Sequence, residues 1–281
     1  MSEMNFSVLI SVYAAEKIDF FRKAMNSVLN QTLMPSEIVL IRDGEVPQGL
    51  QNCIDEFLTL YPELFKYIPL EKNVGLGRAL NIGVESSSND LIIRMDSDDI
   101  CVPERFELQV SYMKNNPEIA VLGGQIEEFE ADELCRGFKR EVPTEHNLIV
   151  NFMKTRNPFN HMTVAFRKKA VLDAGNYLEM HYAEDYYLWC RMLLNNETFA
   201  NLPDTLVFAR TGGGMFQRRG GIKYFLSLKR LEDFKLKHKL INFGEYAKTI
   251  MIRFILQVVF TKQLREFVMK KFARTNNRSK G

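Results

Sequence analysis

Short apolar runs alternate with helical patterns over the first 130 residues of the chain. Four of these runs are bounded by polar residues and are nearly all apolar, as is typical of buried strands: residues 6–12, 37–42, 66–70 and 90–95. Between them, apolar residues recur every three or four positions and predict helices, for example over residues 76–85. Buried strands that alternate with helices predict an α/β fold, with a mostly parallel sheet flanked by helices.

From about residue 144 the pattern is less regular. An apolar run at residues 161–166 predicts a further strand, residues 184–194 predict a helix, and residues 205–209 predict a short strand. Two longer helical patterns, at residues 222–239 and 246–272, close the chain. Because ligands bind at the carboxyl ends of parallel strands, the polar residues just after each run are the first candidates for a site.

The distribution of charge indicates an anionic partner. The chain has 281 residues, of which 46% are hydrophobic and 26% charged, as in ordinary globular proteins. Residues 210–281 hold 18 Lys and Arg against 4 Asp and Glu, whereas the rest of the chain is acidic. A basic C-terminal quarter favours phosphates, an anionic membrane or nucleic acid as partners. Residues 246–272 combine apolar and basic positions, and predict a helix that lies on an anionic membrane or packs against protein.

The sequence favours a cytoplasmic location. Its four cysteines lie far apart, which predicts reduced thiols and neither a disulfide framework nor a zinc site. The first residues lack the basic flank and apolar core of a signal peptide, and no window has the roughly 18 uninterrupted apolar residues that span a bilayer. We therefore expect a cytoplasmic protein, held peripherally at the inner face of the membrane.

Three carboxylates, Asp96, Asp98 and Asp99, follow the apolar run at residues 90–95. Like charges repel one another at a strand end, but hard oxygen ligands suit Mg²⁺ or Mn²⁺. Such a cation can bridge two phosphates and neutralise a departing diphosphate. The cluster therefore predicts a site for a divalent metal and a diphosphate. The structural alternative is an acidic turn in which Asp99 starts the next helix.

Five segments resemble, in the same order, the motifs of GT-A glycosyltransferases, particularly the inverting enzymes of family 2. They are FSVLISVY at residues 6–13, QTLMPSEIVLIRDG at 31–44, NVGLGRALNIG at 73–83, DSD at 96–98 and ED at 184–185. The resemblance covers residues 6–210 and implies a GT-A fold, a Rossmann-like sheet flanked by helices. It implies a catalytic domain and a basic helical C-terminal extension. Their bounds are 1–210 (nucleotide-binding half about 1–115, acceptor half about 116–210) and 211–281.

The resemblance also implies roles for individual residues. The nucleotide of a UDP-sugar would be bound by Ser11, Tyr13, Asp43, Asn73, Arg78, Asp96 and Ser97. Asp98, with Asp96, would hold Mn²⁺ or Mg²⁺, and Asp185 would be the catalytic base. The acceptor or the diphosphate would be contacted by Glu184, His161, Arg218 and Arg219.

These residues have structural alternatives that the sequence leaves open. Asp43 is also suited to a turn, and Arg78 to an exposed surface. Asp185 is also suited to stabilising a helix N-terminus, and His161 to a hydrogen-bonded place in the core. The Gly-rich basic segment at residues 211–221 would either close over a diphosphate or stay a solvated loop.

The expected function is inverting transfer of a hexose from a UDP-sugar to a polyprenyl-diphosphate-linked oligosaccharide. The EDYYLW segment at residues 184–189 and the C-terminal extension resemble bacterial O-antigen and capsule enzymes, with galactose as the best guess. The QxxRW motif of processive synthases is absent. Two alternatives remain: a nucleotide-sugar-binding protein without turnover, and a basic nucleic-acid-binding protein. The tail has few aromatic residues for base stacking, and we expect no nucleic acid as a partner.

Overall fold

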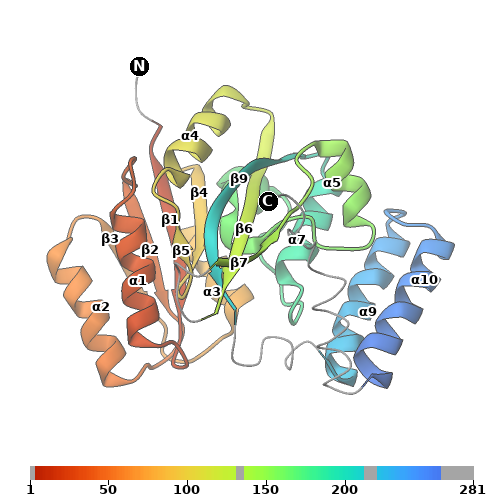
Figure 1. Cartoon of the computed structure of the whole chain (residues 1–281), viewed down its shortest axis with the longest axis horizontal. Helices are drawn as coiled ribbons and strands as arrows, with labels where there is room; N and C mark the ends of the chain where they lie inside the picture. Colours follow the sequence, from red (N-terminus) through yellow and green to blue (C-terminus); the bar gives the residue numbers. More distant parts are fainter. Residues whose placement is uncertain (1–3, 131–135, 212–219, 261–281) are drawn as a thin grey trace.

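The computed structural model of the chain describes residues 4–130, 136–211 and 220–260. Its centre is one mixed sheet with helices on both faces (Figure 1). Four strands of the amino-terminal half pair in parallel in the order β3-β2-β1-β4: β1 (Phe6–Val12), β2 (Glu37–Arg42), β3 (Phe65–Pro69) and β4 (Leu91–Asp96). The four strands predicted from apolar runs are thus confirmed. The strand order reverses at β1, which lies between β2 and β4, and ligands bind at the carboxyl ends beside such a reversal.

The remaining strands make the sheet mixed. β8 (Ala165–Arg167) lies antiparallel between β4 and β6 (Ile119–Phe129). β6 pairs in parallel with β9 (Thr198–Arg210). Two further strands, β5 (Ile100–Cys101) and β7 (Arg136–Arg140), pair antiparallel with β9 and β6. The α/β fold is confirmed, and its continuous parallel part is the amino-terminal half.

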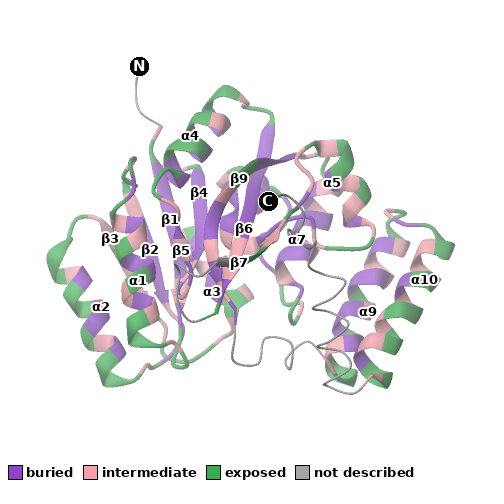
Figure 2. Ribbon diagram, viewed as in Figure 1, coloured by how far each residue is buried: buried purple, intermediate pink, exposed green. Residues whose placement is uncertain are grey.

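Two hydrophobic cores cover the two faces of the sheet (Figure 2). One face is covered by α1 (Ile18–Leu29), α2 (Gln48–Leu60) and α4 (Arg105–Asn115). The other is covered by α3 (Leu76–Ser86), α5 (His146–Met153), α6 (Lys168–Asp173), α7 (Glu184–Leu194) and α9 (Ile222–Lys237). Because side chains alternate along a strand, Leu9 and Ile10 of β1 enter opposite cores. Each such side chain contributes about 1.5–3 kcal/mol when fully buried.

Two strand predictions in the second half differ from the structure. Residues 161–163 form a 3₁₀ turn, η1 (His161–Thr163), and only the end of the predicted run is extended, as β8. The strand predicted at residues 205–209 is the last part of the longer β9. The sequence pattern does not predict β6, because Gly123 and Gly124 interrupt its apolar residues and its register with β9 shifts there.

The C-terminal helices are shorter than predicted. After α9, α10 (Phe243–Phe254) begins at a capping box formed by Asn242 and Glu245, and packs beside α9 (Figure 1). One π-helical turn, η2 (Ile255–Val259), follows, and Phe260 has an extended backbone. The helix predicted over residues 246–272 is thus present from residue 246 to Val259, as α10 and η2, and the extended backbone at Phe260 interrupts it. Residues 261–272 lie outside the described residues. In the parts that are described, no helix has the length and apolar character to cross a membrane.

The contact between α3 and β1 can be tested at Gly83. A methyl group at Gly83 would collide with the buried Leu9 side chain, with Leu9 Cγ only 3.2 Å away. We expect Gly83→Ala to lower the free energy of unfolding by about 1–3 kcal/mol, although this change stabilises most helices. In a double-mutant cycle measured by urea unfolding, Leu9→Ala should relieve the collision, so that the double variant loses less than the sum of the single variants. Strict additivity would show that the contact is not strained.

Candidate active site

A cavity of about 590 Å³ lies at the carboxyl ends of β1, β2 and β4. It brings together six of the seven residues predicted to bind the nucleotide, and also Asp98. These are Ser11, Tyr13, Asp43, Asn73, Asp96, Ser97 and Asp98. Arg78 does not line the cavity and is exposed on α3. Arg218 and Arg219 lie outside the described residues.

A buried arginine anchors the first aspartate of the acidic cluster. Arg94 is 2% exposed on β4, and its Nη2 donates a hydrogen bond to Oδ1 of Asp96. Its Nε and Nη1 have no hydrogen-bond partner among the described residues. Asp96 therefore keeps one oxygen free of this ion pair. One sequence signal could have revealed this ion pair, because Arg94 is a charged residue within the apolar run DLIIRM.

The other carboxylates of the cluster are crowded. Burial, Asp96 and Glu16 raise the pKa of Asp98 to about 7, and burial with the neighbouring aspartates raises that of Asp99. Such raised pKa values mark negative charge that the protein alone does not neutralise. The oxygen-only donors and the excess of negative charge fit Mn²⁺ or Mg²⁺. Within the described residues, no three Asp, Glu, His or Cys side chains are placed so that they could hold a metal by themselves.

The carboxylate of Asp43 organises the opposite wall of the cavity. Its Oδ1 and Oδ2 accept the backbone N–H groups of Val74 and Gly75, at 2.7 and 3.1 Å. Asn73 donates back to the Asp43 carbonyl oxygen at 3.2 Å. Gly44, at φ 84°, lets the two loops approach, because a methyl group there would meet the Asn73 nitrogen at 2.5 Å. A nucleobase N–H group that bonds Asp43 would therefore share these oxygens with the backbone N–H groups of Val74 and Gly75.

Arg210 places a fixed positive charge at the cavity wall. Its guanidinium lies between two aromatic rings, 3.8 Å from the Phe20 centroid and 4.5 Å from that of Phe129. Its Nε donates to the Asp98 carbonyl oxygen at 3.1 Å, and its backbone N–H to Asp99 Oδ1 at 2.7 Å. Held in this way at the end of β9, Arg210 faces the same space as the acidic cluster. The sequence does not reveal this role, because the residues that hold Arg210 are distant in the chain.

The acceptor-side candidates form a second polar cluster. Asp185 lies in the first turn of α7, where its Oδ2 accepts Nδ2 of Asn157 at 2.6 Å and lies 4.0 Å from Nδ1 of His161. His161 Nε2 and the Tyr177 hydroxyl are 2.9 Å apart. Burial, partly offset by hydrogen bonds from Tyr186 and Asn157, raises the pKa of Asp185. Burial and the Asp185 charge raise that of Glu184 to about 7.

The two clusters are close enough to influence each other. The Arg94 charge lowers the pKa values of both Glu184 and Asp185, and the Asp96 charge raises that of Glu184. The start of α3 also joins them, because Leu76 lines the cavity and a methyl group at Gly77 would lie 3.2 Å from Glu184 Cβ. The cavity and the polar cluster around Asp185 are therefore neighbours.

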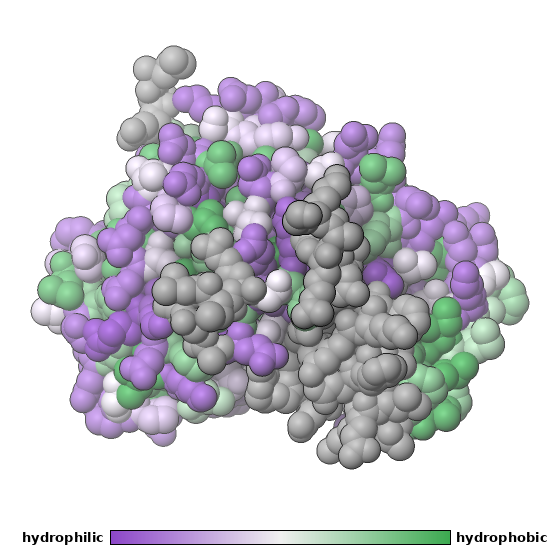
Figure 3. All heavy atoms as spheres, in the orientation of Figure 1, coloured by the Kyte–Doolittle hydropathy of each residue, from purple (hydrophilic) through white to green (hydrophobic). Residues whose placement is uncertain are grey.

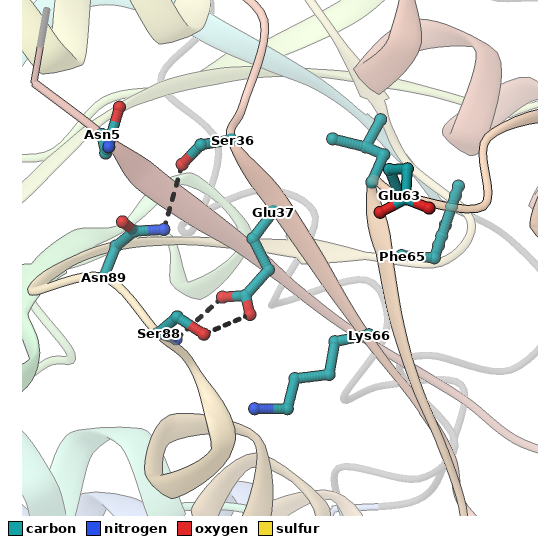
Figure 4. Close-up of a pocket in the computed structure, with 9 residues that line it drawn as sticks. Asn5, Ser36, Glu37, Glu63, Phe65, Lys66, Ser88 and Asn89 are labelled. Atoms are coloured by element: carbon teal, nitrogen blue, oxygen red, sulfur yellow. Dashed lines mark hydrogen bonds between the residues drawn. The ribbon is translucent and has the colours of Figure 1, made fainter.

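A smaller cavity, of about 260 Å³, lies at the amino ends of β1, β2 and β3 (Figure 4). The Glu37 carboxylate there accepts hydrogen bonds from Ser7 at 2.5 Å and from Ser88 Oγ at 2.7 Å. These contacts join the amino ends of neighbouring segments and leave the carboxylate satisfied. We assign this cavity a structural role.

Comparison with known sequences identifies the family. The sequence model of glycosyl transferase family 2 matches residues 7–175, more than half of the chain. The chain is a member of glycosyl transferase family 2. The amylovoran biosynthesis glycosyltransferase of Erwinia amylovora is 40% identical over 266 residues, which cover 95% of this chain and 98% of the relative. An Escherichia coli UDP-Gal:alpha-D-GlcNAc-diphosphoundecaprenol beta-1,3-galactosyltransferase is 35% identical and covers 96% of each chain.

Solved structures support the same fold for this family 2 glycosyltransferase. Residues 1–349 of S. aureus TarS in complex with UDP-GlcNAc match with a TM-score of 0.65 and 20% identity, over 92% of this chain and 74% of that fragment. A Pyrobaculum calidifontis mannosyltransferase in complex with GDP-Man and Mn²⁺ matches with a TM-score of 0.63 and 10% identity, over 96% and 76%. The predicted GT-A fold is confirmed.

The acidic cluster predicts opposite effects for two similar substitutions. Because the pKa of Asp98 is raised from 3.8 to about 7 in the folded protein, the free energy of unfolding falls as the pH rises through this range. Asp98→Asn should therefore raise the melting temperature of the metal-free protein at pH 8, yet weaken Mn²⁺-dependent UDP binding at least about tenfold. Asp96→Asn leaves Arg94 without its carboxylate and should lower the free energy of unfolding by about 1.5–3 kcal/mol. Calorimetry and thermal unfolding check both, and equal stability changes would contradict this reading.

Proposed function

We propose that this glycosyltransferase moves a hexose, with galactose as the first candidate, from a UDP-sugar to a lipid-linked saccharide, with inversion. The single observation that carries the proposal is the arrangement of the two clusters. Asp96 and Asp98 line a nucleotide-sized cavity, and the charges of Asp96 and Asp185 both raise the pKa of Glu184, so the two clusters are neighbours. The Erwinia and Escherichia relatives, named for amylovoran synthesis and for galactose transfer to a diphosphoundecaprenol acceptor, support bacterial surface polysaccharide synthesis as the setting.

The donor side would hold the nucleotide and its diphosphate. Tyr13 and Asp43 border the part of the cavity that would take the base, and Asp96 and Asp98 lie where the diphosphate would reach the end of β4. When bound there by Asp98 and Asp96, Mn²⁺ or Mg²⁺ would neutralise charge on the departing diphosphate. Arg210 lies against the same wall and would add a fixed positive charge.

The acceptor side would supply the base. An acceptor hydroxyl would give its proton to the Asp185 carboxylate while its oxygen forms the bond to the anomeric carbon. The bond between that carbon and the phosphate oxygen breaks as UDP leaves, so attack from the opposite face inverts the configuration. One carboxylate suffices for this reaction, and no covalent intermediate forms. Glu184 lies beside Asp185 and would bind the acceptor.

The C-terminal helices would hold the enzyme at an anionic membrane, where a lipid-linked acceptor lies. Several apolar side chains are exposed on α10 and η2: Phe243, Met251, Ile252, Phe254, Ile255, Val258 and Val259. Figure 3 shows hydrophobic (green) side chains gathered at the lower right, where Figure 1 places α10. Exposed Lys223 and Arg230 lie on the neighbouring α9, and exposed Lys248 lies on α10. Apolar burial and attraction to anionic lipids together support such binding.

The donor preference can be tested directly. In a screen of UDP-Gal, UDP-Glc, UDP-GlcNAc and dTDP-Rha with Mn²⁺ and a diphosphate-lipid acceptor analogue, we expect UDP-Gal to be the best donor.

The assigned base can be tested in the same assay. Asp185→Asn should lower kcat at least about 10³-fold while leaving UDP affinity nearly unchanged, because the Asp185 side chain does not line the donor cavity. Normal turnover by this variant would show that the base is misassigned. UDP binding without transfer or hydrolysis by the wild type would favour a binding protein.

Membrane attachment can be tested separately from catalysis. We expect Met251→Asp with Val259→Asp to weaken binding to phosphatidylglycerol-containing vesicles at least about tenfold, because two apolar side chains would be lost from the interface. Leu60→Asp, at an equally exposed apolar position on α2, is the matched control and should bind normally. Co-sedimentation measures binding, and transfer to a water-soluble acceptor should be unchanged in all variants. Equal binding by all three proteins would refute this surface.

A further inference from the structure

Asn157 donates a hydrogen bond directly to the carboxylate of the proposed base. It lies between α5 and η1, and its Nδ2 donates to Asp185 Oδ2 at 2.6 Å. The other oxygen, Oδ1, accepts the backbone N–H of Tyr186 at 2.7 Å. Both oxygens of the carboxylate are thus oriented, one by its own helix and one by a residue 28 positions earlier in the chain.

The orientation of the Asn157 amide is determined by its other contact. Its Oδ1 accepts the backbone N–H of Phe159 at 3.3 Å, so the amide nitrogen must point toward Asp185. The loop itself is held in place by buried side chains. Asn160, fully buried, donates to the Gly124 carbonyl oxygen at 2.9 Å, and Asn201 donates to that of Pro158 at 3.2 Å. Asn157 is therefore a donor mounted on a rigid support.

A second side chain, His161 of η1, lies near the same oxygen of Asp185. Burial and the Arg94 charge lower the pKa of His161, so its ring is neutral at physiological pH. Its Nε2 lies 2.9 Å from the Tyr177 hydroxyl, and its Nδ1 lies 4.0 Å from Asp185 Oδ2. The second distance is too long for a hydrogen bond, whereas Asn157 bonds the same oxygen directly.

We propose that Asn157 is a positioning residue for catalysis, which aims the Asp185 carboxylate at the acceptor hydroxyl and keeps it ionised. The proposal rests on Asp185 being the base. A hydrogen bond donated to a carboxylate stabilises its charged form, whereas burial destabilises it. Other charged or titratable groups act on Asp185 from the elements around it: Glu184, Tyr186, His161, Tyr177, Arg94 and Arg140. These groups stay in place when Asn157 alone is changed, so its contribution can be isolated.

The test is the pH dependence of kcat/KM for Asn157→Leu and Asn157→Gln in the full-length enzyme. Without the donated N–H, the base binds its proton more tightly, so the acidic limb of the profile should move up by about one pH unit. Activity below that limb should fall about tenfold, with UDP affinity unchanged. It should recover only in part at higher pH, because the ionised carboxylate is then less well oriented. Asn157→Gln keeps the amide and should move the limb less than Asn157→Leu.

Each outcome separates the two levels of the proposal. A loss that is equal at every pH, or an unmoved limb in Asn157→Leu, would overturn the role of Asn157. If Asn157→Leu does not fold, as judged by circular dichroism, an unmoved limb in Asn157→Gln with lowered kcat would do the same. If Asp185→Asn remains fully active, the base assignment fails instead, and with it the proposed mechanism.

Discussion

Crowding of negative charge at the carboxyl end of β4 is the constraint on which the site depends. Three of the four residues from Asp96 to Asp99 are aspartates, and Glu16, from the loop after β1, adds a further negative charge. Two arginines offset part of this charge: Arg94 bonds the Asp96 carboxylate, and Arg210 bonds the Asp98 carbonyl oxygen. Under the proposed function, the remaining excess would be costly to the empty protein and favourable for a cation with its diphosphate, so stability and ligand binding would be in opposition at this point.

Arg94 is the charged group that acts on both clusters of the site. Its charge, buried on β4, influences Asp96, Glu184 and Asp185. The helix α7, which carries both Glu184 and Asp185, packs on the same face of the sheet as α3. Under the proposed function, this fixed framework would hold donor and base at a constant separation, which lowers the entropic cost of reaching the transition state.

The parts of the fold that could be predicted are those whose signal is local. β1, β2 and α7 have uninterrupted apolar or amphipathic patterns and appear within a residue of the predicted bounds. β6 has glycines at its centre, and the turn at His161 depends on packing, so neither follows from local pattern. The predicted cavity residues lie at strand ends and could therefore be predicted from the sequence. Asn157 and Arg210 could not be predicted, because each is placed by contacts with residues far along the chain.

The proposed function requires that the sugar is transferred in one displacement, assisted by one carboxylate. The most direct measurement is the anomeric configuration of the first product formed from a UDP-sugar, determined by NMR before any further reaction. Transfer in one displacement predicts a new glycosidic bond of opposite configuration to that in the donor. Retention of the donor configuration would require two displacements or attack from the same face, and would contradict it.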